Sequence, residues 1–220
     1  MAKDRIEKII EIINSISGEY TQHQVFSDWV CMMALSIANA CSPFHNSAYA
    51  EREKRYEQVA YKYSEKIIDF SEAMRLLVEE MENPRDILGE IYMRGGFGSK
   101  TTGQFFTPYH LSKITARMTF DEFTRMQDGK YHANEPSCGG GGMLIALAME
   151  MKKRGINYQN ELEVVAQDLD WNCVYMCYVQ LSLMGISGIV VQGNTLLEPY
   201  SKKTNETRIL ITPKKRGLLI

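Results

Sequence analysis

The sequence predicts an α/β fold in which part of a parallel β-sheet follows a helical N-terminal region. Apolar residues recur at helical spacing near the start of the chain, as Ile6, Ile9 and Ile13 do. Further along, short β-branched runs alternate with helical tracts, which is typical of parallel strands joined by right-handed crossovers. We therefore expect residues 1–95 to form a helical region and residues 103–220 to form a partial sheet domain.

The helical region contains several tracts with an apolar face. The helical pattern returns between Val25 and Ile37, and a third tract, rich in charged residues and tyrosine, runs from Ala50 toward Met81. Pro84 stands where a further helix can begin, ahead of the sequence RDILGEIYMR. The glycine-rich stretch GGFGSKTTG then predicts a loop, and we place the boundary between the two regions there.

The sheet domain is predicted from strand-like runs and two helical tracts. The strand candidates are ELEVVAQD, SGIVVQG and TRILIT, with the shorter HAN before Glu135 as a candidate first strand. The helical tracts run from Gly141 to Arg154 and from Trp171 to Met184, and each is followed by a glycine suited to a helix C-cap. In such a sheet, ligands bind at the edge formed by the carboxyl ends of the parallel strands.

The composition is that of an ordinary globular protein. With 220 residues the chain can bury one main core, and its 45% hydrophobic and 24% charged residues indicate neither disorder nor a fibrous structure. The formal net charge of -2 and the pI near 6.1 give no overall basic surface for nucleic acid. Any contact with nucleic acid is therefore expected to be local.

The cysteine and histidine patterns indicate neither a disulfide framework nor a metal site. The five cysteines form an odd set without a CxxC pair, which suits a reduced, cytoplasmic chain. The four histidines are scattered without metal-ligand spacing. The N-terminus lacks the apolar core of a signal peptide, and no stretch reaches the roughly 18 apolar residues of a membrane span, so we expect no membrane contact.

A run of four glycines, Gly139 to Gly142 in EPSCGGGGML, separates a predicted strand from a predicted helix. Glycine adopts positive φ angles freely, and its missing Cβ leaves room for a ligand against the main chain. The following helix N-terminus offers unpaired N–H groups to a carboxylate or phosphate. A flexible turn without a ligand is the alternative interpretation, because short glycine motifs are often misleading.

Asp168 ends the run ELEVVAQD, at the same predicted edge as the glycine turn. A carboxylate at this place can accept hydrogen bonds from both ribose hydroxyls of a nucleoside ligand. The glycine pattern differs from the GxGxxG fingerprint of dinucleotide-binding folds. The alternative interpretation is that Asp168 caps the helix that begins at Trp171.

Taken together, these segments resemble the methylation subunits of type I restriction-modification systems, which are N6-adenine DNA methyltransferases that use S-adenosylmethionine. The resemblance runs from Asp86 to about Glu198. DILGEIYMR resembles the helix before that family's catalytic domain, GQFFTP its characteristic motif, and EPSCGGGGML its cofactor loop DPACGSGGFL. AQDLD matches its ribose-binding acid, and GNTLLEP its loop after the third strand. The resemblance implies a Rossmann-like methyltransferase sheet, here partial, with S-adenosylmethionine as cofactor.

The resemblance also implies which residues surround the methionine portion of the cofactor. Phe106, Thr107 and Pro108 would lie over it. Ordinary core packing is the alternative for the aromatic pair, and it suits Phe105 better than Phe106. The glycine loop would frame the same portion, through Glu135, Pro136, Cys138, Gly139 and Gly141. Cys138 itself is expected to be a small buried filler rather than a nucleophile, because no base lies near it in sequence.

The nucleoside contacts implied by the resemblance follow the next two strands. Asp168 would bind the ribose, and Leu169 and Asn194 would border the adenine ring. Asn194 stands where the family usually has Asp, so this contact departs from the family pattern.

The catalytic motif of the family is missing from the sequence. The family places NPPF or NPPY after the fourth strand, where Asn and the first Pro carbonyl hold the target amine and the aromatic ring stacks on the flipped base. Here Thr212 and Pro213 follow the fourth strand candidate at about that position, and the two lysines after them cannot stack as an aromatic ring does. The catalytic residues are therefore unknown, and we expect a truncated domain without target recognition of its own.

These observations predict an S-adenosylmethionine-binding domain of the N6-adenine DNA methyltransferase class, active alone or with a second chain. Its partners would be DNA, reached through a specificity subunit, and other chains in a homo- or hetero-oligomer. One alternative is a catalytically inactive, methyltransferase-like binding or regulatory module of a phage or mobile element, and another is a fragment without activity. The helical region would pack on the sheet domain, contact DNA or form an oligomer interface, and the sequence does not choose among these roles.

Overall fold

The protein consists of an N-terminal group of helices and a β-sheet that is packed against further helices. The computed structural model describes residues 4–98, 106–121, 123 and 128–218. The sheet contains, in spatial order, β1 (Tyr131–Glu135), β2 (Leu162–Asp168), β3 (Ser187–Gln192) and β4 (Ile209–Ile211). The helices are α1 (Arg5–Ile16), α2 (Gln22–Ala40), α3 (Ser47–Lys62), α4 (Ile67–Glu80), α5 (Ile87–Arg94), α6 (Tyr109–Thr119), α7 (Gly142–Lys153), α8 (Tyr158–Glu161) and α9 (Trp171–Leu183). This architecture confirms the predicted α/β class.

Helix α1 forms as its isoleucine pattern predicts. Asp4 caps it by accepting a hydrogen bond from the Glu7 N–H at 2.7 Å. The buried isoleucines of the helix are Ile6, Ile9, Ile10, Ile13 and Ile16. This apolar face packs mainly against α4, with smaller contacts to α5 and α2.

The third predicted tract is divided into two helices, α3 and α4. The helix stops at Tyr63, and a short 3-10 helix, η1 (Ser64–Lys66), follows. The buried Tyr63 ring packs against Tyr20 and Phe70, and its hydroxyl donates to Asp28 Oδ2 at 2.9 Å. Anchoring this side chain in the core accounts for the change of direction, which helical spacing alone did not indicate.

Helix α5 begins at Ile87 rather than at Pro84. Asp86 is its N-cap, and the Asp86 Oδ1 accepts from the Gly89 N–H at 3.0 Å. An aspartate side chain satisfies an N–H that the first helical turn leaves unpaired, which favours the start at this position.

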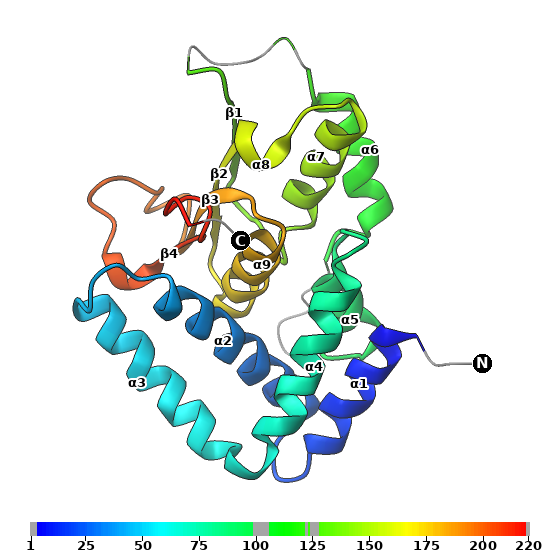
Figure 1. The fold of residues 1–220 in the computed structure, drawn as a ribbon, viewed down its shortest axis with the longest axis vertical. Coiled ribbons are helices and arrows are strands. Elements are labelled where there is room, and N and C mark those ends of the chain that lie inside the picture. Colours follow the sequence, from blue (N-terminus) through cyan, green and yellow to red (C-terminus); the bar gives the residue numbers. More distant parts are fainter. Residues whose placement is uncertain (1–3, 99–105, 122, 124–127, 219–220) are drawn as a thin grey trace.

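The helical region packs on the sheet domain, which settles one question that the sequence left open. Helices α2 and α5 both contact α9. One continuous buried cluster joins the two regions and includes Trp29 and Val30 of α2 together with Val174 and Tyr178 of α9. Figure 1 shows α1 to α5 gathered below α9 and the sheet. The predicted boundary near Gly95 therefore does not interrupt the core.

Strands β1, β2 and β3 are parallel, as the alternation of strands and helices predicts. β1 pairs with β2 as far as Glu135↔Ala166, and β2 pairs with β3 as far as Asp168↔Gln192. Helices α7, α8 and α9 lie on one side of the sheet, and the segment between β3 and β4 lies on the other (Figure 1). The carboxyl ends of the three parallel strands consequently meet at one edge.

Strand β4 is antiparallel to β3, which contradicts the prediction of a parallel fourth strand. Ile189 of β3 pairs with Ile211 of β4. A parallel strand requires a crossover that returns the chain to the opposite edge, usually through a helix. Residues 193–208 contain the short 3-10 helix η2 (Glu206–Arg208) as their only helical element, so the chain turns back beside β3.

Thr212 and Pro213 therefore lie at the sheet edge opposite to Asp168. The Thr212 N–H donates to the Gly188 oxygen at 3.0 Å, and Thr212 Oγ1 accepts from the Gly188 N–H at 2.9 Å. The same hydroxyl donates to the Ile186 oxygen at 2.8 Å. Gly188 lies at the amino end of β3 and Ile186 directly precedes this strand, away from the edge at which the catalytic motif was expected.

The cysteines contribute to the core rather than to crosslinks. All five are free, and Cys41 is the one that is partly exposed while the other four are buried. As a separate observation, none of the helices in the described ranges has the length and apolar character needed to cross a membrane.

Thr212→Val is expected to destabilise the sheet at β4. Valine keeps the shape of the side chain but leaves the Gly188 N–H and the Ile186 carbonyl without their hydroxyl partner, and an unpaired buried polar group costs about 1–3 kcal/mol. Urea unfolding should show this loss. Thr212→Ser retains the hydroxyl and should stay close to the parent protein, whereas equal midpoints for the valine and serine variants would contradict the role of the hydroxyl.

Candidate cofactor site

The turn between β1 and α7 is built from the predicted glycine run. Gly139 has a φ of +51° and Gly141 a φ of +92°, both in the left-handed region that favours glycine. A Cβ added at Gly139 would lie 3.2 Å from the Phe106 ring, and one at Gly141 would lie 3.1 Å from Cys177 Sγ. These two positions therefore require glycine both for backbone conformation and for close packing.

Asp168 lies at the carboxyl end of β2, next to this turn. Its Oδ2 accepts from the Gly139 N–H at 2.9 Å, and its Oδ1 accepts from the Asp170 N–H at 3.0 Å. Asp170, not Asp168, is the N-cap of α9, since its side chain accepts from the Asn172 N–H at 2.9 Å. The alternative interpretation of Asp168 as a helix cap is therefore wrong.

Asp86 joins the site from the helical region, and sequence reasoning did not include it. Its Oδ1 accepts from Gln180 Nε2 at 2.9 Å, and the same nitrogen donates to the Gly140 oxygen at 2.7 Å. Gln180 Oε1 accepts from the Leu88 N–H at 3.0 Å. An aspartate before an apolar run is recognisable in sequence as a helix cap, but its approach to the glycine turn depends on tertiary packing.

These elements enclose a cavity of about 190 Å³ at the carboxyl edge of the sheet, which we call the cofactor cavity. The predicted residues that line it are Phe106, Thr107, Cys138, Gly139 and Asp168. The other lining residues are Asp86, Ser112, Ser137, Gly140, Gly142 and Met143. The fully buried Ser112 hydroxyl has no hydrogen-bond partner within the described residues. As far as the chain is described, no lysine or arginine lines this cavity.

The remaining predicted residues do not line the cofactor cavity. They are Pro108, Glu135, Pro136, Gly141, Leu169 and Asn194. Leu169 is 66% exposed. The Asn194 Oδ1 accepts from the Leu196 N–H at 3.0 Å, so this side chain organises its own loop. The Pro136 oxygen accepts from the Thr195 hydroxyl at 2.7 Å, which joins this loop to the glycine turn.

Phe106 takes part both in packing and in the cavity. Its half-buried ring lies 4.8 Å from the Tyr92 ring, measured between centroids, and it contacts Gly139. Core packing and a place in the cavity lining, the two interpretations of Phe106, are thus compatible. Phe105 lies outside the described residues, as do Gly103 and Gln104 of the same motif.

Two carboxyl groups near this edge, those of Asp86 and Glu135, have raised pKa values. Burial raises the pKa of Asp86, although the hydrogen bonds from Gln180 and Gly89 oppose this effect. Burial also raises the pKa of Glu135, and the negative charge of Asp168 adds to the increase. Acids placed close together in this way favour a bound cation, which would stabilise their ionised forms.

The thiol of Cys138 is not arranged as a nucleophile. Its hydrogen bond with Cys177, followed by burial, raises the pKa of the Cys138 thiol well above its usual range. A thiol held in the neutral form is unreactive. Cys138 is also 5% exposed, so the geometry agrees with the expectation of a buried filler.

Three parallel strands with a glycine turn after one strand and an acid at the end of the next are typical of Rossmann-like folds. The family model described as N-6 DNA Methylase matches residues 83–214, which is more than half of the chain. The chain belongs to this N6-adenine DNA methylase family, as its motifs predict.

A solved structure has a similar fold. It is the crystal structure of a Listeria monocytogenes protein provisionally assigned to the class I S-adenosylmethionine-dependent methyltransferases. The match covers 89% of this chain with a TM-score of 0.53 and 12% sequence identity, and this chain spans 55% of the length of that protein. At this identity the likeness shows the fold alone, and it confirms the Rossmann-like class.

Gly139→Ala is expected to destabilise the protein, because alanine is strained at a φ of +51°. The left-handed conformation costs a non-glycine residue roughly 1–2 kcal/mol. Gly140→Ala is the matched control: Gly140 has no positive φ, and its added Cβ would meet the flexible end of Met176 at 3.2 Å. Chemical denaturation should show the larger loss for Gly139→Ala, and equal losses would argue against backbone strain at Gly139.

The raised pKa of Asp86 is expected to make stability depend on pH. The unfolded chain ionises this carboxyl near its ordinary pKa of about 3.9, whereas the folded protein keeps the proton to higher pH. In the interval between these two pKa values the folded state binds more protons, so the free energy of unfolding falls as pH rises.

Asp86→Asn imitates the protonated carboxyl and should remove this part of the pH dependence. The asparagine oxygen can still accept from Gly89 and Gln180, so the fold should be retained. The measurement is urea denaturation of both proteins between about pH 4 and 8. Parallel pH profiles for the two proteins would contradict the assignment of the raised pKa to Asp86.

Proposed function

We propose that the chain binds S-adenosylmethionine in the cofactor cavity and forms the cofactor-binding part of an adenine-N6 DNA methyltransferase. The observation that carries this proposal is the acidic lining of a cavity that a glycine turn opens at the carboxyl edge of the sheet. When bound, the cofactor supplies an electrophilic methyl group on its sulfonium. The chain's own residues would bind and orient it.

The charge of the cavity distinguishes between nucleoside ligands. S-adenosylmethionine carries a sulfonium and an ammonium against one carboxylate, so it is a net cation. Dinucleotides and ATP carry several negative phosphate charges, which the carboxylates of Asp86 and Asp168 would repel. The lining therefore fits S-adenosylmethionine better than a phosphorylated nucleotide.

The hydrogen bonds already made in the protein suggest a role for each polar side chain. Each oxygen of Asp168 accepts one main-chain N–H and keeps a further lone pair for a ribose hydroxyl. Asp86 takes its bonds from Gly89 and Gln180 through Oδ1, which leaves Oδ2 for the ammonium group. The unpartnered Ser112 hydroxyl would complete the amino-acid end.

The finer assignment follows the sequence motifs. We place the chain with the methylation subunits of type I restriction-modification systems, on GQFFTP, the glycine loop and the acid at 168. DNA would be its substrate, reached with a specificity subunit. Thr212 lies at the opposite edge of the sheet, so the groups that hold the target amine would come from another part of the assembly.

A cofactor-binding module without catalysis is the second candidate. The missing NPP[FY] sequence and the location of Thr212 and Pro213 favour it. Such a module, of the kind a phage or mobile element carries, would use the same cavity to bind the cofactor and would act on a partner protein.

Asp168→Asn is expected to weaken S-adenosylmethionine binding by roughly tenfold or more, since hydrogen bonds to a charged group contribute about 1.5–3 kcal/mol. Asp170→Asn is the matched control, because it removes a neighbouring charge while asparagine remains a good N-cap. Isothermal titration calorimetry on both variants measures the effect. Equal affinities for the two variants would argue against the ribose role of Asp168.

Methyl transfer separates the two candidates. The protein is incubated with labelled S-adenosylmethionine and DNA, first alone and then with candidate partner subunits. Labelled DNA in either condition supports the enzyme. Cofactor binding without labelled DNA in any condition supports the module, and a protein that does not bind S-adenosylmethionine would overturn both.

A further inference from the structure

A second cavity lies between the helical region and the segment that joins β3 to β4. Its volume is about 320 Å³, and none of its lining residues belongs to the cofactor cavity. Arg52 of α3 and Arg216, which follows β4, both line it. We call it the arginine cavity.

Arg52 is held in the arginine cavity by neutral groups. Its Nε donates to Asn39 Oδ1 and its Nη2 donates to Ser42 Oγ, each at 2.7 Å. Arg52 is 8% exposed. Burial lowers the pKa of Arg52, and the nearby positive charge of Arg216 lowers it further. In the described part of the chain no carboxylate forms an ion pair with Arg52, so its charge is not compensated.

Within the described ranges, the guanidinium group of Arg216 has fewer polar contacts than that of Arg52. Its Nε is buried without a hydrogen-bond partner among the residues that the structure describes. Glu206 is the acid that lines the cavity, and it accepts from Asn46 Nδ2 at 3.3 Å instead of pairing with either arginine. Burying the charge of Arg52 without an anion is unfavourable, and the partly buried Arg216 in the same cavity adds repulsion between the two positive charges.

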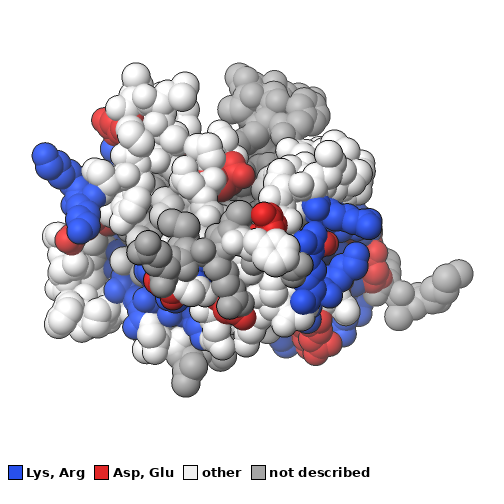
Figure 2. Space-filling view, turned by 90° about the horizontal axis from the view of Figure 1, so that it is seen from above, with Lys and Arg blue, Asp and Glu red and all other residues white. Residues whose placement is uncertain are grey.

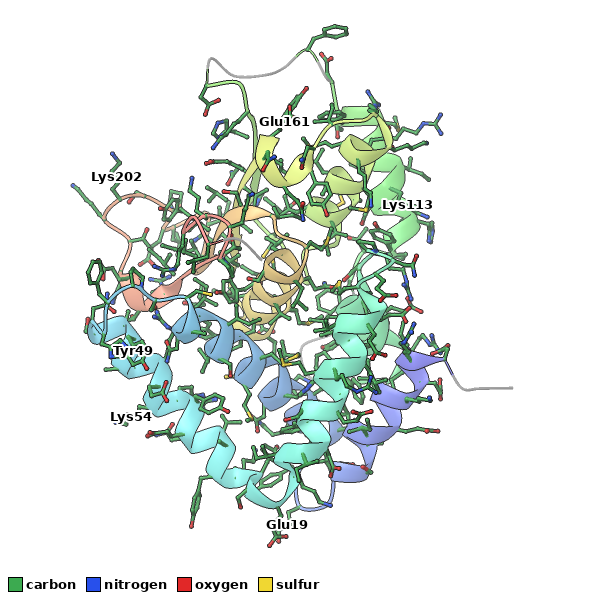
Figure 3. The ribbon with its side chains drawn as sticks, in the orientation of Figure 1. Glu19, Tyr49, Lys54, Lys113, Glu161 and Lys202 are labelled. Atoms are coloured by element: carbon green, nitrogen blue, oxygen red, sulfur yellow. The ribbon has the colours of Figure 1, made fainter. Side chains whose placement is uncertain are left out.

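We propose that the arginine cavity binds a phosphoryl group between Arg52 and Arg216. The planar fork of a guanidinium matches two oxygens of a phosphate, and a phosphate would neutralise both charges. Lys202 lies at the same cavity and extends from its segment into solvent (Figure 3), so it adds a cation at the rim. The lining thus offers three basic side chains against the single acid Glu206.

The surroundings suit a phosphate that belongs to a nucleotide or a nucleic acid strand. Phe44, which is 75% exposed, and Tyr200 line the cavity beside the arginines. Exposed aromatic rings next to basic groups provide stacking surfaces for a base or sugar. Thr204 and Ser201 add hydroxyl groups. This site does not depend on S-adenosylmethionine binding.

The test uses Arg216→Gln in the full chain. No side-chain hydrogen bond of Arg216 is seen within the described residues, whereas replacing Arg52 would break its contacts with Asn39 and Ser42 and disturb the fold. Lys203→Gln is the matched control, because it removes one positive charge from the segment between β3 and β4, next to Lys202, at a residue that does not line the cavity. The probes are inorganic phosphate, a nucleoside monophosphate and a short DNA duplex, each at constant ionic strength.

For the small probes, calorimetry should show binding to the parent and to Lys203→Gln, and roughly tenfold or greater weakening in Arg216→Gln. For the duplex, the slope of log Kobs against log salt should fall by about one in Arg216→Gln and remain unchanged in Lys203→Gln. Either pattern supports the phosphoryl site and identifies its source.

Three outcomes would overturn the proposal. They are no binding of any probe, equal binding by Arg216→Gln and the parent, and equal weakening in Arg216→Gln and Lys203→Gln. The last of these would indicate a general effect of charge.

Discussion

One buried amide, the side chain of Gln180 in α9, joins the start of α5 to the glycine turn, two of the elements that line the cofactor cavity. It donates to Asp86 at the start of α5 and to Gly140 in the glycine turn, and it accepts from the Leu88 N–H. Gln180 is fully buried, so the Gly140 oxygen and the Leu88 N–H would lose their hydrogen-bond partner in a medium without water if the amide moved. The helical region is therefore part of the candidate site, because α5 cannot shift relative to the turn without breaking this network.

Strand direction decides which residues can act together at the ligand edge. Parallel pairing brings the ends of β1, β2 and β3 to one edge, where Asp168 meets the glycine turn. The antiparallel β4 places Thr212 beside Ile186 and Gly188 at the other edge. The described sheet thus has the glycine turn and Asp168 at one edge, where we propose that the cofactor binds, and the structural hydroxyl of Thr212 at the other.

The two cavities carry opposite charge, although the whole chain has a net charge of -2. Carboxylates line the cofactor cavity, and arginines line the other. Figure 2 shows one face on which lysine and arginine side chains gather in separate groups with acidic side chains between them. The net charge of the whole chain therefore gives no indication of the local acidic and basic sites.

The sequence by itself determined the features that depend on neighbouring residues. The isoleucines of α1, the runs that form β2 and β3, and the glycines that need positive φ are local matters of periodicity and backbone conformation. Only the tertiary structure decided the direction of β4, the change of direction at Tyr63, the approach of Asp86 to the glycine turn, and the meeting of Arg52 with Arg216. Each of these depends on groups far apart in the chain, whose contact is set by how the helices and the sheet pack, and no local pattern records that packing.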